Sequence, residues 1–341
     1  MKNAMKLLNI LKKVQEIIKK MRIYISDLTV SMIDKINKKV SGGTEKFKPN
    51  VLYPYAHLES GNDNTELRKL IEAKNRDIYN SLMLDSGTYV MHQLEEEKGI
   101  HFDYKLGCDR YINFVKGVSD FVDYYINYDV SFGYKDGSTK IPYHQSLNTY
   151  SQETLESNGL NPVYVMHSAS PNEMQYVYDK KYKFVAISSA ILNSKEFEHA
   201  NDIIKKFYKK GIKTHLLGCA SYNRLSQTCA WSCDASSYGR WASFGKMIYF
   251  SERENKEIQL SVSEYNKKNE LNSDYYLLKE NQKYVYEYED FMFPSLGLGV
   301  DEIVSDKSSS NLILANAYYM YHLEKIINDI QRENKITFDI L

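Results

Sequence analysis

Two aspartates lie in contexts that suit covalent chemistry at the anomeric carbon of a sugar. Asp85 stands in the segment LDSGTYV, and Asp234 stands in the segment WSCDASSYGRW. A carboxylate that attacks the sugar as its substituent leaves divides a difficult displacement into two easier steps, and a second carboxyl group can transfer the proton. Each aspartate alone has a structural alternative, since Asp-Ser-Gly is a common turn and Asp85 could cap the following helix.

Short β-rich runs alternate with amphipathic helical stretches along most of the chain. We expect helices over residues 65–79, 171–182 and 194–210. Strict alternation favours parallel pairing, and runs that are apolar on both faces suit strands buried on both sides. The sequence therefore predicts an α/β fold, namely a (β/α)8 TIM barrel, with a doubly wound open sheet as the alternative. The eight expected strands are residues 21–26, 50–58, 81–87, 121–130, 162–168, 183–189, 213–219 and 231–235.

The position of polar residues favours the barrel over the open sheet. Asp85, Asp129, His167, Ser188 and Asp234 all fall at predicted carboxyl ends of strands. In a barrel these ends form one mouth, where catalytic groups collect. We therefore expect these side chains to share one site.

The chain divides into four predicted parts. Residues 1–20 form an amphipathic N-terminal helix, residues 21–250 the barrel core, residues 251–307 an insertion or small subdomain, and residues 308–341 a closing helix and tail. The N-terminal helix could bind a membrane surface, pack on the body of the protein, or precede a native start further along the chain.

The amino-acid composition restricts the possible binding partners but does not identify one. Positive and negative charges balance at net zero, so a nucleic-acid surface would have to be a local patch. The thirty tyrosines could stack on bases, but an AT-rich genome would also produce them. No apolar run approaches the ~20 residues of a membrane helix, so we predict no membrane partner.

The four cysteines predict a cytoplasmic protein with reduced thiols, because they form no dense framework and no secretory signal accompanies them. Cys219, Cys229 and Cys233 could bind a metal together with His215. No C-x-x-C pair is present, however, and we predict no metal site.

Taken together, the two aspartate segments resemble the queuine/archaeosine tRNA-guanine transglycosylase family and its shorter phage relatives, which insert 7-deazaguanines into DNA. The resemblance covers roughly residues 80–245 and the last helix, Asn311 to Arg332. In the family, a DSGGFQ motif carries the acid/base aspartate, and a later strand-end aspartate is the nucleophile. The resemblance implies the first role for Asp85 and the second for Asp234.

Further strand ends match the family in order and spacing. Its base-binding FDE-type strand end matches NYD, which ends at Asp129, and its VQGG and AIGG strands match VMHS and AISS. Tyr89 or Tyr128 could stack on the base, although core packing is the more common role of a tyrosine. The resemblance implies a base site made of Ser86, Gly87, Asp129, His167, Ser188, Ser189 and Gly218.

Two departures from the family pattern change the expected substrate. The family's tRNA enzymes bind a structural zinc through a C-x-C-x-x-C run and a distant histidine, and this sequence has neither, so no cofactor is expected. His167 replaces the glutamine that reads the base, and Ser188-Ser189 replaces a Gly-Gly pair. The resemblance therefore does not determine which base the protein recognises. Loss of the zinc region favours DNA over tRNA.

These inferences predict a transglycosylase that exchanges guanine in DNA for a 7-deazaguanine such as preQ0. Its expected partners are DNA or tRNA and the free base, with a homodimer as a further possibility. Arg240 and Trp241, just past the nucleophile, are candidates for phosphate contact and for stacking or wedging. The alternatives are the same exchange on tRNA, a glycoside hydrolase, and a catalytically idle barrel that binds nucleic acid.

Overall fold

The computed structural model describes most of the chain in ten segments. They are residues 20–40, 46–55, 65–88, 91, 97–99, 103–129, 145–189, 191–192, 197–261 and 279–338. Apart from Lys20, the predicted helix of residues 1–20 lies outside the described residues. Tyr89 also lies outside them.

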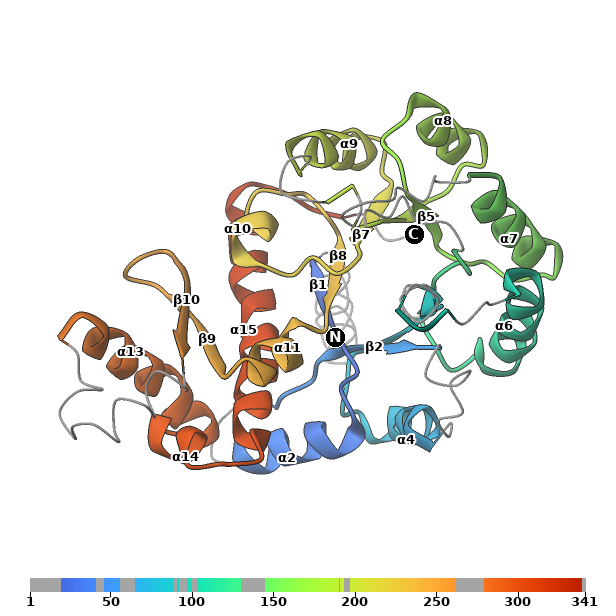
Figure 1. Ribbon diagram of the computed structural model, residues 1–341. Coiled ribbons are helices and arrows are strands. Elements are labelled where there is room, and N and C mark those ends of the chain that lie inside the picture. The colour runs from blue at the N-terminus through green and yellow to red at the C-terminus, as the bar shows by residue number, and fades with distance from the viewer. Residues whose placement is uncertain are drawn as a thin grey trace, which may run out of the picture.

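Eight parallel strands form one curled sheet at the centre of the protein (Figure 1). Their order is β4-β3-β2-β1-β8-β7-β6-β5, so the first and last strands in sequence pair with each other. Every one of the eight predicted strands is confirmed, and so is the α/β class. The strands are β1 (Arg22–Ser26), β2 (Asn50–Pro54), β3 (Ser81–Asp85), β4 (Tyr124–Tyr125), β5 (Tyr164–Met166), β6 (Phe184–Ile187), β7 (Lys213–Leu216) and β8 (Ser232–Ala235).

The curled sheet is not closed by a continuous ladder at the seam between β4 and β5. A single parallel bridge joins Ile126 to Val163 there, with Val163 N–H donating to Tyr125 O at 2.8 Å and Asn127 N–H donating to Val163 O at 2.9 Å. Val165, the next residue whose backbone faces this seam, instead has its carbonyl oxygen bonded by Asn148 Nδ2 at 2.7 Å. The arrangement is thus TIM-barrel-like, with one weak seam where we expected regular pairing.

Helices cover the outer face of the sheet (Figure 1). Local sequence fixes where several of them begin: Asp103 accepts hydrogen bonds from the N–H groups of Lys105 and Leu106, and Ser170 caps a helix that opens with Pro171. The helices are α2 (Val30–Val40), α4 (Thr65–Ala73) with the 3-10 turn η1 (Lys74–Arg76), α6 (Tyr104–Val118), α7 (Gln145–Ser157), α8 (Pro171–Asp179), α9 (Phe197–Lys209), α10 (Tyr222–Leu225) and α11 (Ser237–Ser243).

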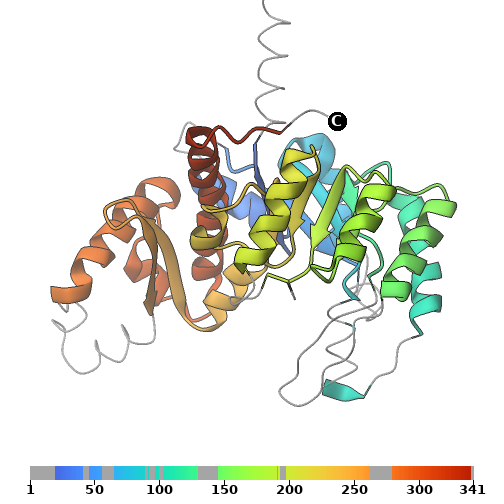
Figure 2. The same cartoon turned by 90° about the horizontal axis from the view of Figure 1, so that it is seen from above.

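An excursion follows α11 before the chain returns to the sheet. It contains the antiparallel hairpin β9 (Lys246–Ser251) and β10 (Lys256–Ser261), then α13 (Lys279–Leu296) and α14 (Val300–Val304). These elements stand to one side of the curled sheet (Figure 2). None of the described helices is both long enough and apolar enough to cross a membrane.

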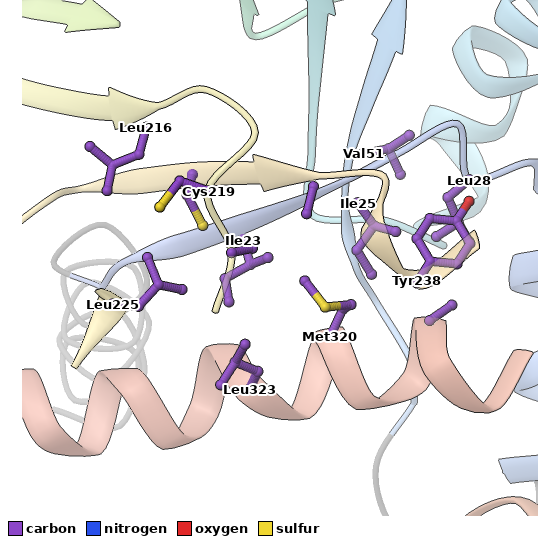
Figure 3. Packing of buried hydrophobic residues seen from close by; sticks show 14 of the residues in the cluster. Ile23, Ile25, Leu28, Val51, Leu216, Cys219, Leu225, Tyr238, Met320 and Leu323 are labelled. Carbon is purple, nitrogen blue, oxygen red and sulfur yellow. The ribbon is translucent and has the colours of Figure 1, made fainter. Parts of the chain in front are cut away.

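The last helix, α15 (Ser310–Glu333), occupies the position of the eighth barrel helix and packs on β1. Its Met320 and Leu323 point toward Ile23 and Ile25 (Figure 3). All four side chains belong to the main hydrophobic core, which lies between the sheet and its helices. A smaller apolar cluster fills the inside of the curl: Tyr24, Leu52, Met83, Ile126, Val163, Val165 and Ala186.

Polar side chains fix α15 to the amino ends of the first two strands. Glu324 Oε2 accepts hydrogen bonds from Ile23 N–H and from Asn50 Nδ2, both at 2.7 Å. Asn328 accepts from Met21 N–H at 2.8 Å and donates to Met21 O at 3.0 Å. Burial raises the pKa of Glu324 to about 7. The helix is therefore held at the end of the sheet opposite to the predicted mouth.

Tyr128 is a core residue that supports the loop after β4. It is fully buried, its ring lies 5.5 Å from that of Tyr111, and its hydroxyl donates to Met91 Sδ at 3.4 Å. A Cβ atom at Gly107 of α6 would lie 2.1 Å from the Tyr128 hydroxyl oxygen. Core packing, and not stacking on a base, is thus the role of Tyr128, and it depends on a glycine in the facing helix.

We predict that Gly107→Ala lowers the free energy of unfolding by about 1–3 kcal/mol, because the added methyl group displaces a rigid buried ring. Gly117→Ala is the matched control, since it lies in the same helix with nothing within 4 Å of an added Cβ. Alanine has the higher helix propensity, so the control should gain up to ~1 kcal/mol. Urea denaturation of the three proteins measures both values, and equal effects at the two glycines would contradict the packing of Tyr128.

Candidate functional site

Three aspartates meet at the carboxyl ends of the strands. Asp85 ends β3, Asp129 follows β4, and Asp234 lies in β8. The three interact electrostatically, because the charges of Asp129 and Asp234 both act on the carboxyl group of Asp85. The described structure therefore brings together the two predicted catalytic residues and the predicted base-binding aspartate.

Asp85 is the aspartate that holds a proton. Burial, followed by the negative charges of Asp129 and Asp234, raises its pKa to about 8. Its Oδ2 accepts a hydrogen bond from Gly87 N–H at 3.0 Å, which only partly offsets this effect. Gly87 has a φ of 71°, a conformation that favours glycine and brings its N–H back to the carboxylate. At neutral pH this group can donate a proton.

Asp234 has the opposite environment, because three donors surround its carboxylate. Oδ1 lies 2.9 Å from the Gly218 N–H nitrogen and 3.2 Å from His215 Nε2. Oδ2 accepts from the Ser26 hydroxyl at 3.2 Å. Hydrogen bonds to an ionised group stabilise its charge. Asp234 is 9% exposed, so the carboxylate is both hydrogen-bonded and within reach of a ligand at the mouth.

Asp129 is the centre of a second hydrogen-bonded network. Its Oδ1 accepts from the hydroxyl groups of Ser86 at 2.9 Å and Thr88 at 2.8 Å, and its Oδ2 lies 3.1 Å from His167 Nε2. A carboxylate has about four acceptor positions, so one position on Oδ2 remains for a ligand. Bidentate recognition of a base through both oxygens would require Ser86 or Thr88 to release Oδ1.

A buried glutamate positions the loop that carries His167. Glu173, with no exposed surface, accepts hydrogen bonds from His167 N–H at 3.1 Å and from Ser168 N–H at 2.7 Å. We did not identify Glu173 from the sequence. The available signal was the pattern Ser170-x-x-Glu173, which is typical of a helix start.

His215 does not lie with the three cysteines that could have bound a metal together with it. Its Nδ1 lies 2.8 Å from the Ser232 hydroxyl and its Nε2 contacts Asp234, so the imidazole lies inside the curl of the sheet. Cys219, Cys229 and Cys233 instead pack in the outer hydrophobic core. In the part of the chain that the structure describes, no three histidine, cysteine or acidic side chains form a group that could hold a metal.

The remaining predicted site residues follow two strands of the sheet, β6 and β8. Ser188, 5% exposed, and the exposed Ser189 follow β6, where Ser188 N–H donates to Met166 O at 2.9 Å. Arg240 and Trp241 lie on α11, directly after Asp234's strand. Both pairs of residues therefore follow the carboxyl ends of strands in the sheet that carries the three aspartates.

Helix α11 divides its aromatic residues between core and surface. Trp241 is partly buried and packs against the main core, whereas Phe244 is 63% exposed with the Arg240 guanidinium 6.0 Å from its ring centre. We did not identify Phe244 from the sequence, because a single phenylalanine past a helix end carries no signal of exposure. Phe244, more than Trp241, presents an aromatic surface to a partner.

Comparison with known proteins assigns no family to the chain. No protein-family model matches the sequence, and no curated protein matches it. The assignment of a function therefore depends on the geometry at the strand ends.

The proton on Asp85 predicts a pH-dependent effect on stability. A carboxyl group whose folded pKa is raised contributes most below its unfolded pKa, near 3.9, and this contribution is lost as the pH rises through the folded pKa, about 8. The amide introduced by Asp85→Asn does not titrate in this range. We expect this variant to exceed the wild type in free energy of unfolding by on the order of 2–4 kcal/mol at pH 9, with a smaller difference at pH 5.

Urea denaturation at both pH values measures this difference. Asp202→Asn on α9, where the aspartate side chain is 66% exposed, is the matched control and should show no such growth with pH. An Asp85→Asn advantage that stays constant between pH 5 and pH 9 would contradict a protonated Asp85.

Proposed function

We propose that the protein is a transglycosylase that replaces guanine in DNA with a 7-deazaguanine such as preQ0, through a covalent sugar ester of Asp234. The observation that carries this proposal is the unequal state of two neighbouring aspartates. Asp85 retains a proton at neutral pH, with a pKa of about 8, whereas three donors surround the carboxylate of Asp234. An acid beside an ionised nucleophile is the pair that base exchange requires.

The reaction consists of two displacements at the same carbon. In the first, an electron pair of the Asp234 carboxylate forms a bond to C1′ while the bond from C1′ to the base nitrogen breaks. The departing guanine takes the electron pair of that bond and the proton of Asp85. In the second, Asp85 removes a proton from the incoming base, whose nitrogen attacks C1′ and releases Asp234. The proton returns to Asp85, and no water is consumed.

Asp129 and His167 support recognition of a guanine-like base. The open acceptor position on Asp129 Oδ2 can receive one N–H donor from such a base, beside His167 Nε2 at 3.1 Å. Discrimination against an adenine-like ring, which lacks the adjacent donor pair of guanine, would need both oxygens of Asp129 and therefore release of Oδ1 by Ser86 or Thr88. The resemblance to base-exchanging enzymes names the same aspartate for this role.

Access to the aspartates favours a base that has left the duplex. Asp129 and Asp234 are 5% and 9% exposed, so a stacked base cannot reach them and must flip out of the helix or come from a single strand. Arg240 and the exposed Phe244 can contact a phosphate and replace the flipped base in the stack. The missing zinc motif of the tRNA enzymes favours DNA as the polymer.

Incorporation of radiolabelled base tests this function. The protein is incubated with labelled guanine or labelled preQ0 and, separately, with plasmid DNA and bulk tRNA, and acid-precipitable label is counted. We expect label in DNA, and a loss of at least ~10³-fold in rate for Asp234→Asn and Asp85→Asn, since each removes a group that acts in the transition state. Asp202→Asn is the control for a conservative change outside the site.

Each of three outcomes would contradict a different part of the proposal. Label in tRNA alone would overturn DNA as the substrate. Label in neither polymer with either base would overturn base exchange and favour an idle nucleic-acid-binding barrel. Undiminished incorporation by Asp234→Asn would overturn the nucleophile.

A further inference from the structure

His215 lies beneath Asp234 in the interior of the curled sheet. It has no exposed surface, and its ring stands at a steep angle to those of Tyr24 and Phe184 at ring-centre distances of 5.9 and 6.5 Å. Its two nitrogens contact different oxygens, with Nε2 at 3.2 Å from Asp234 Oδ1 and Nδ1 at 2.8 Å from the Ser232 hydroxyl. The imidazole is therefore fixed by packing on its faces and by hydrogen bonds at both nitrogens.

The carboxylate determines which nitrogen carries the proton. An ionised carboxylate only accepts hydrogen bonds, so Nε2 must be the donor to Asp234. In a neutral imidazole Nδ1 is then the acceptor, and the Ser232 hydroxyl, which can donate or accept, donates to it. Asp234 thus selects the Nε2–H form of His215, and the Ser232 hydroxyl adapts to it.

The two oxygens of Asp234 consequently differ in availability. Oδ1 receives both Gly218 N–H and His215 Nε2–H, which fill its two acceptor positions. Among the residues that the structure describes, Ser26 alone donates to Oδ2, through its hydroxyl at 3.2 Å, which leaves one electron pair of Oδ2 for another partner.

We propose that His215 is a positioning residue that commits Oδ1 of Asp234 to hydrogen bonding and leaves Oδ2 as the oxygen that bonds to the sugar. This inference rests on the proposed base exchange. In the first step the free electron pair of Oδ2 forms the bond to C1′, and Oδ1 becomes the carbonyl oxygen of the ester. In the second step the returning charge is shared with Oδ1, where Gly218 and His215 still donate, so the same donors stabilise the leaving carboxylate.

Nitrogen-15 NMR of the histidine rings tests the geometry without any substrate. The chain has eight histidines, and the His215 signals are those missing from a His215→Gln spectrum. We expect the Nε2–H tautomer at neutral pH, with Nδ1 shifted toward the free-acceptor value when Ser232→Ala removes its donor. An Nδ1–H tautomer, or a ring unaffected by Ser232→Ala, would overturn the inference.

Exchange kinetics test the consequence for catalysis. His215→Gln keeps a side-chain N–H donor, whereas His215→Leu removes it at similar volume, and Phe184→Leu disturbs only the packing around the ring. We expect kcat to fall ~10²-fold for His215→Leu with little change in KM, a loss of less than ~10-fold for His215→Gln, and a small effect for Phe184→Leu.

The outcomes separate this inference from the function on which it rests. A wild type that exchanges no base refutes the proposed function, and the NMR result then still decides the tautomer. A wild type that exchanges bases, with a kcat for His215→Leu equal to that for His215→Gln, refutes the positioning role alone.

Discussion

Burial of three mutually repelling carboxyl groups at one end of the sheet is the constraint on which the rest of the site depends. Like charges in a partly dry pocket cannot all persist without donors to stabilise them. Asp129 and Asp234 each have three side-chain or backbone donors, whereas Asp85 accepts from backbone N–H groups of its own turn. The proton therefore resides on Asp85, with a pKa of about 8. The division into acid and nucleophile follows from how unequally the fold distributes its donors.

The residues that hold the sheet together lie at the opposite end of the strands from the residues proposed to react. Glu324 and Asn328 of α15 bind the amino ends of β1 and β2, while the three aspartates stand at the carboxyl ends of the strands. Parallel strands make this separation possible, because all their carboxyl ends face one side. Loops at that side can then vary in chemistry without loss of the packing shown by Met320 and Leu323 (Figure 3).

The eight strands and the meeting of Asp85, Asp129 and Asp234 were predictable from the sequence, because both follow from the alternation of apolar runs with polar strand ends. The position of His215 could not be predicted, because nothing in the segment KTHL distinguishes a histidine that faces the interior of the sheet from one that binds a metal. Thr88 acts through a contact with Asp129, which is 41 residues away in the chain, and Glu173 acts through the N–H groups of His167 and Ser168 in the loop before its own helix. The weak seam between β4 and β5 depends on how these two strands meet, and the exposure of Phe244 depends on the packing of α11, so neither is a property of local pattern.

Trapping the ester on Asp234 tests the central claim most directly. The protein is mixed with a single-stranded, guanine-containing oligonucleotide, quenched in acid, and examined by intact-protein and peptide mass spectrometry. The account predicts an added mass equal to the oligonucleotide without one guanine, located on the peptide that contains Asp234, absent from Asp234→Asn and removed by a chase with preQ0. An adduct on another residue, or base exchange by a protein that never carries the adduct, would contradict it.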